Sequence, residues 1–122
     1  MASSFQDLRV WREAIKLAVS IYGATEKFPK HELYGLTSQI RRAAVSVASN
    51  IAEGKGHRSS REFCNFLFHA RGSLQELQTQ LIIARELKCL PQTDAEALLA
   101  QAASAARGLN ALINAVRPEG SS

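Results

Sequence analysis

The 122-residue sequence has little of what turns and β-sheets require: three prolines, and only 7% aromatic residues. An all-β sandwich uses more aromatic and β-branched side chains and more turns, so the composition points away from that class. Apolar residues make up 46%, too many for a disordered chain. At roughly 100 to 200 residues per domain, residues 1–122 form a single domain, and the composition favours an all-α fold.

Cysteine is scarce, and a membrane or export segment is lacking. Cys64 and Cys89 form neither a disulfide framework nor a close pair of zinc ligands, so we interpret them as buried or idle thiols in a reducing cytosol. The N-terminus lacks the basic and apolar regions of a signal peptide. The most apolar stretch, residues 63–84, carries charged residues and three glutamines, which exclude a lone membrane span. We therefore expect a soluble, cytoplasmic protein without a membrane partner.

Four segments have apolar residues at steps of three and four, the spacing of one helical face. Because the connectors between them are short, the sequence predicts an up-down-up-down antiparallel four-helix bundle. We expect an ordered core over about residues 5–116 and a frayed tail over residues 117–122. The predicted buried faces are Leu8, Trp11, Ile15, Ala18, Tyr22 and Thr25; Leu36, Ile40, Ala43, Ala44, Val47 and Ile51; Phe63, Leu67, Ala70, Leu74, Leu77, Leu81 and Ala84; and Leu98, Leu99, Ala102, Ala106, Leu109, Leu112, Ile113 and Val116.

Local signals predict where these helices begin and end. The second helix starts near Leu33, and the glycines of residues 54–56 can supply the left-handed residue that stops it. Residues 59–62 and 93–96 each fit a capping box, in which a Ser or Thr and a Glu satisfy each other's backbone amides. These boxes predict the starts of the third helix, which runs from Ser60 to Cys89, and of the fourth.

The second helix carries a polar stripe without lysine. A solvated face normally holds long flexible charges, whereas short hydroxyls and amides suit fixed hydrogen-bond partners. We therefore expect a structural network between helices or subunits. Its members are Gln39, Arg42, Ser46, Ser49, Asn50 and Glu53.

Apolar residues also occur off the predicted core faces, which suggests a subunit interface. Scattered surface apolar residues are common, and they are the competing explanation. We favour a homo-oligomer. The predicted interface residues are Val45, Ala48 and Ala52 on the second helix and Phe68, Ile82 and Ile83 on the third.

No constellation for catalysis is present. His31, His57 and His69 do not cluster, and none has the Glu-x-x-His spacing of di-iron bundles. Residues 54–59 begin like a dinucleotide fingerprint but lack its third glycine and follow a helix instead of a strand. No histidine accompanies Ser46 and Ser49 as a base. We expect no enzyme, no cofactor or metal, and no small-molecule substrate.

The chain has a net charge of +4, and one group of its basic residues is concentrated around the end of the second helix and the start of the third. The N-terminus of the third helix adds free amides that favour anions, so this group could hold the phosphates of RNA or DNA. In a monomer an ordinary basic connector explains this group slightly better than binding does, whereas a ring would repeat the patch and favour binding. Arg9, Arg12 and Lys16 are the alternative site. The candidate residues are Arg41, Lys55, His57, Arg58 and Arg61.

Residues 34–54 contain the pattern Gln-x-x-Arg-Ala-x-x-Ser-x-x-x-Asn-Ile-Ala-Glu-Gly. This segment resembles the bacterial family encoded within intervening sequences of 23S ribosomal RNA genes, and the similarity extends over residues 5 to about 115. The resemblance implies a four-helix bundle that assembles into a ring, typically a homopentamer with a central channel. A more distant similarity is to the accessory protein of diversity-generating retroelements, which works with a reverse transcriptase and nucleic acid. Neither relative is known to be an enzyme.

Together these features predict a noncatalytic, oligomeric four-helix bundle that binds structured RNA or DNA, ribosomal RNA included, through basic residues repeated around a ring. The alternative is a protein-interaction scaffold, or a structural oligomer, whose positive charge is incidental.

Overall fold

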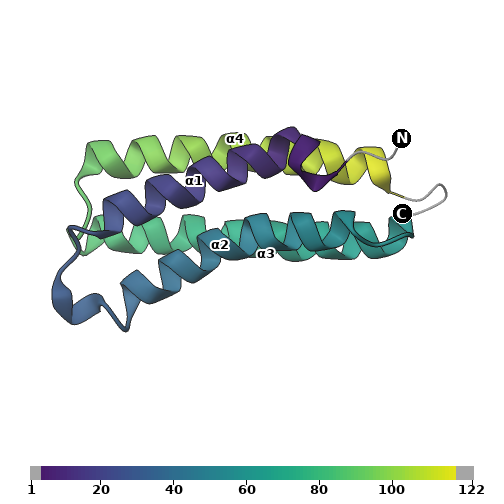
Figure 1. Ribbon diagram of the computed structural model, residues 1–122. Coiled ribbons are helices and arrows are strands. Elements are labelled where there is room, and N and C mark those ends of the chain that lie inside the picture. Colours follow the sequence, from purple (N-terminus) through teal and green to yellow (C-terminus); the bar gives the residue numbers. More distant parts are fainter. Residues whose placement is uncertain (1–3, 118–122) are drawn as a thin grey trace.

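The computed structural model describes residues 4–117 and confirms the four-helix bundle. Each long helix packs on two neighbours, in the order α1, α2, α3, α4 and back to α1. Figure 1 shows α1 and α4 on one side, α2 and α3 on the other, and the α2–α3 turn at the same end as η1. The elements are the 3-10 helix η1 (Phe5–Asp7), α1 (Arg9–Thr25), the 3-10 helix η2 (Lys30–Glu32), α2 (Leu36–Lys55), α3 (Ser60–Glu86) and α4 (Gln92–Val116).

The buried face of α1 is shifted by one sequence position from the predicted face, which corresponds to a rotation of about 100° around the helix axis. Of the predicted face, Ile15 and Tyr22 are exposed instead. Both faces of α1 are apolar, so the spacing fits either, and contact with α2 and α4 decides between them. The residues of α1 that are buried are Val10, Ala14, Leu17, Ile21 and Thr25.

The core face of α2 is confirmed, but its two ends differ from the prediction. The helix begins at Leu36, after η2. It ends at Lys55 with Gly56 in a right-handed conformation (φ −74°, ψ −13°), so the predicted left-handed glycine is wrong. Gly54 has another role: a Cβ there would lie 2.6 Å from the Phe66 Cβ. A glycine therefore lets α2 and α3 approach each other closely.

In α3 the seven predicted seam residues are all buried, which confirms the heptad spacing. The helix ends at Glu86, earlier than the predicted Cys89. Two residues beyond this end, Lys88 adopts a left-handed conformation, with φ 62°. The amide of Cys89 donates to the Ala84 carbonyl at 2.9 Å, and the Lys88 amide donates to the Arg85 carbonyl at 3.0 Å, the two bonds of a Schellman motif.

The fourth helix begins at Gln92, directly after Pro91, and no side chain caps it. The predicted capping box at residues 93–96 is therefore wrong, because Thr93 already lies inside the helix. Its buried positions include Leu98, Ala102, Leu109 and Ile113 of the predicted face, and the other four predicted residues pack at the edge of the core. Of the expected frayed tail, residues 118–122 lie outside the described residues.

Within residues 4–117, none of the helices combines the length and the apolar character that a membrane crossing demands.

Candidate functional site

Four of the five candidate nucleic-acid-binding residues gather at the α2–α3 turn. Lys55 ends α2, His57 and Arg58 lie in the turn, and Arg61 lies in the first turn of α3. Their grouping follows from the short connector, which brings the C-terminal end of one helix to the N-terminal end of the next.

The turn is shaped by two polar contacts. The Ser59 hydroxyl accepts a hydrogen bond from the Glu62 amide at 3.1 Å, which confirms Ser59 as the cap of α3. The Glu62 carboxylate does not complete the capping box. Its Oε2 lies 2.6 Å from Nδ1 of His57, so the acidic group nearest the cations is engaged with the imidazole.

The cations of the turn have no carboxylate partner among the described residues. Arg58 and Arg61 are exposed, and neither forms an ion pair within residues 4–117. Lys55 Nζ lies 5.8 Å from the centre of the Phe63 ring, at the outer limit of a cation–π contact. These charges are therefore available to an anionic ligand.

Arg41, the fifth candidate, lies apart from this turn. It precedes Lys55 by about 21 Å along the helix, at 1.5 Å per residue. Its Nε donates to the Thr25 hydroxyl at 2.8 Å, and its guanidinium lies 4.6 Å from the centre of the Tyr22 ring. These contacts join α2 to α1, so the structure gives Arg41 a packing role.

The polar stripe of α2 is divided between a hydrogen-bonded part and an open part. The Ser46 hydroxyl lies 2.8 Å from the Ser73 hydroxyl of α3, and Asn50 Nδ2 donates to the Ser46 carbonyl and hydroxyl. This part is a network between helices. The side chains of the open part are exposed and form no hydrogen bond within the described chain; they belong to Gln39, Arg42, Ser49 and Glu53.

A polar groove of about 700 Å³ runs between α2 and α3 beside this network. Its α3 side was missed by the sequence reasoning, although the spacing of three and four between Ser73, Glu76 and Gln80 shows that they share a face. Gln80 is 93% buried, and its Oε1 lacks a hydrogen-bond partner within the described residues. The groove is lined by Gln39, Arg42, Ala43, Ser46, Ser73, Glu76 and Gln80.

The predicted interface residues have unequal exposure. Val45, Ile82 and Ile83 are exposed, and Ala52 is partly buried. Ala48 is only 6% exposed and belongs to the core. This position removes it from any interface between subunits.

Phe68 is also less available than expected. It packs against the core and lies 4.8 Å from the Arg71 guanidinium. The sequence reasoning missed exposed apolar side chains on α1, since it assigned Ile15 and Tyr22 to the core. Val19, between them, is 67% exposed.

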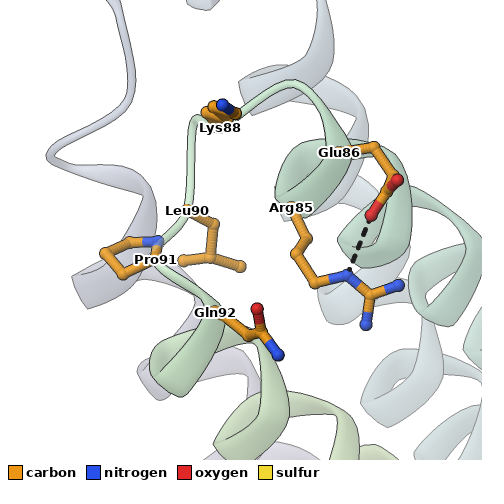
Figure 2. A pocket seen from close by; sticks show the side chains of 6 residues that line it. All are labelled: Arg85, Glu86, Lys88, Leu90, Pro91 and Gln92. Atoms are coloured by element: carbon orange, nitrogen blue, oxygen red, sulfur yellow. Dashed lines mark hydrogen bonds and ion pairs between the residues drawn. The ribbon is translucent and has the colours of Figure 1, made fainter.

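Two shallow hollows lie elsewhere on the bundle. One, of about 730 Å³, surrounds the α3–α4 turn, where Arg85 Nε lies 3.2 Å from Glu86 Oε2 while Lys88, Leu90, Pro91 and Gln92 line the rest (Figure 2). The other, of about 550 Å³, lies between α1 and α4 around Val10 and Gly108. The first hollow contains no residue of the predicted sites, whereas Arg9 of the alternative basic site lines part of the second.

The remaining reactive groups are the two cysteines and the side chains that could bind a metal ion. Both cysteines are free; Cys64 is buried, with its Sγ 4.0 Å from the Ile113 carbonyl. Burial raises the pKa of the Cys89 thiol, and the charge of Glu32 raises it further. Within residues 4–117, the His, Cys, Asp and Glu side chains form no group of three that could hold a metal ion.

Comparison with known proteins identifies relatives of this chain. Residues 6–111 match the family described as 23S rRNA-intervening sequence protein. A crystal structure from Bacteroides thetaiotaomicron, described as a protein with unknown function from the S23 ribosomal protein family, matches with a TM-score of 0.80 and 20% identity, covering 85% of this chain and 97% of that chain. The structural likeness shows the shared fold. No curated protein matches the chain.

Proposed function

The chain belongs to the 23S rRNA-intervening sequence protein family, and from this premise we propose that it is a noncatalytic, oligomeric bundle that binds structured RNA or DNA. The observation that carries the proposal is the group of unpaired cations at the α2–α3 turn. Phosphate backbones are bound through such charges, whose attraction is independent of base sequence.

The existing contacts of the arginines favour this turn over the alternative site on α1. Arg9 forms an ion pair with Glu13 at 3.4 Å, and Arg12 donates to the Gln6 carbonyl at 3.0 Å. Arg58 and Arg61 have no such partners within the described chain. Binding phosphate at the turn therefore breaks no existing ion pair of these arginines.

The contacts of the reactive side chains at the α2–α3 turn support the proposal that the protein is noncatalytic. The pair formed by His57 and Glu62 resembles the base and orienting carboxylate of a hydrolase. However, the adjacent Ser59 hydroxyl accepts from the Glu62 amide and caps α3. Among the described residues, no hydrogen bond joins the Ser59 hydroxyl to the His57 imidazole, as a serine nucleophile and its base would form.

The oligomeric part is supported by a second apolar surface over α1 and α2. Ile15, Val19 and Tyr22 are exposed on α1, and Val45 is exposed on α2. The contact between Arg41 and Tyr22 shows that this side of α1 adjoins α2. Exposed apolar side chains on two neighbouring helices are typical of a subunit interface, and a ring of subunits, such as a pentamer, would repeat the basic turn around its axis.

A salt titration of binding tests the proposal. We expect wild-type protein to bind a labelled RNA stem-loop and a 20-base-pair DNA duplex with an affinity that falls steeply as salt rises. Replacing Lys55, Arg58 and Arg61 together by alanine should weaken binding to both and flatten the slope by about one unit per lost phosphate contact. Fluorescence anisotropy measures both effects.

The matched control replaces Arg9, Arg12 and Lys16 by alanine, and it should retain the wild-type slope. If the control variant loses binding instead, the site is on α1. An absence of binding to either probe at low salt would end the nucleic-acid proposal and favour the interaction scaffold, for which the exposed apolar surface is the supporting observation.

A further inference from the structure

The α2–α3 turn holds stacked rings beside its cations. The His57 imidazole lies on the Phe66 ring with 4.8 Å between centroids and 22° between planes. His69 adjoins the same phenyl ring at 6.3 Å, tilted by 52°. The His57 side chain is 38% exposed, so Phe66 supports a ring that still faces solvent.

Close packing holds this stack in place. Phe66 can approach α2 only because residue 54 is a glycine: an added Cβ would meet the Phe66 Cβ at 2.6 Å and the Phe63 Cδ1 at 3.1 Å. The 2.6 Å contact between Glu62 Oε2 and Nδ1 then orients the imidazole upon the phenyl ring. Because Phe66 packs on one face of the imidazole and Glu62 holds its edge, the His57 ring loses little rotational freedom when a ligand stacks on it.

We propose that the exposed part of the His57 ring stacks on an unpaired base of a single-stranded nucleic acid, while Lys55, Arg58 and Arg61 contact the flanking phosphates. This inference rests on the proposed function and narrows its ligand to single strands and to loops of structured RNA. Every base has a flat π-surface, so stacking tolerates any sequence. Bases inside a duplex are covered by their neighbours and cannot reach the ring, which makes an unpaired base the fitting partner.

The test compares ligands with the same phosphates but different bases. The probes are labelled dT12, a 12-mer in which every base is absent, and a 12-base-pair duplex, all measured by anisotropy at low salt and across a salt series. Wild-type protein should bind dT12 at least about fivefold more tightly than the abasic 12-mer, as expected for one stacked base. The duplex should bind no more tightly than the abasic strand after correction for its charge.

Variants locate the effect. His57→Ala should reduce the preference for dT12 over the abasic strand to about one while leaving the salt slope unchanged. His57→Phe should retain the preference, because it keeps a ring. The matched control is His31→Ala, an exposed histidine in η2 that pairs with Glu32, and it should behave as wild type. Circular dichroism melting confirms that each variant is folded.

The outcomes separate this inference from the function on which it rests. Equal wild-type binding to dT12 and to the abasic strand overturns base stacking while phosphate binding stands. A preference that survives His57→Ala also overturns the inference, since the base then stacks elsewhere. Failure of every probe to bind at low salt overturns the proposed function itself.

Discussion

Single residues in unusual environments mark the places where the fold is most constrained. Lys88 has a left-handed backbone, which costs an L-residue roughly 1–2 kcal/mol relative to its usual conformations. It holds this conformation because the Schellman motif satisfies the last carbonyls of α3 and because Leu90, buried beyond it, directs the chain into α4. At position 54 the constraint is contact distance instead, since only a glycine leaves room for Phe66.

Replacing Lys88 by glycine should stabilise the protein by about 0.5 to 1 kcal/mol, because glycine adopts this conformation without a Cβ clash. Urea denaturation at fixed protein concentration measures the change. Lys88→Ala is the matched control: it removes the same charge and keeps the strain, so it should give no gain. Equal effects of the two substitutions would show that the charge, and not the backbone, matters.

At the scale of helices, the two predicted capping boxes differ in outcome because their neighbours differ. Ser59 follows the α2–α3 turn, adopts an extended backbone (φ −93°, ψ 145°) and caps α3. Before α4, the proline at position 91 occupies the cap position, and the helix starts at the next residue. The Thr93 side chain is therefore displaced from the cap by two residues, although its local sequence fits the motif.

This difference predicts unequal effects of removing two hydroxyls. Ser59→Ala should lower the free energy of unfolding by about 1 kcal/mol, the usual value of a helix cap. Thr93→Ala, at an exposed position inside α4, should change it by less than about 0.5 kcal/mol. Thermal or urea unfolding of the two variants provides the comparison. Similar losses for both would contradict the assigned start of α4.

At the scale of the whole molecule, the apolar residues serve two surfaces. The core is filled by one face of each helix, while Ile15, Val19 and Tyr22 form a second, exposed apolar face on α1 and Val45 is exposed on the neighbouring helix α2. Exposed apolar side chains grouped in this way account for the oligomer that we propose. The basic turn lies at one end of the bundle (Figure 1). An oligomer would therefore repeat the turn, and its assembly need not cover it.

Val19→Lys tests this surface. Because Val19 is 67% exposed, the change should leave the helical content of the subunit intact while it disrupts an interface. We expect a lower mass by light scattering or sedimentation. Leu87→Lys, an equally drastic change at an exposed residue beyond the end of α3, is the control and should keep the wild-type mass. An unchanged mass for Val19→Lys would place the interface elsewhere.

The existence and order of the helices could be predicted from the chain because apolar spacing is a local property. The seam of α3 is the clearest case, since all seven of its residues are buried as expected. The cations of the turn were found for the same reason: Lys55, Arg58 and Arg61 are near neighbours in sequence. Arg41 shows the limit of this reasoning, because its partners Thr25 and Tyr22 come from another helix.

Contacts between distant segments decided the rest. Local spacing allowed two buried faces for α1, and packing against α2 and α4 selected the one that contains Leu17. The α3 side of the polar groove and the His57–Phe66 stack likewise required two helices to be placed against each other. Periodicity describes one helix at a time, whereas burial, close approach and ring stacking depend on what the neighbouring helix presents. The chain therefore specifies its helices locally, and their surfaces acquire their roles only when the bundle assembles.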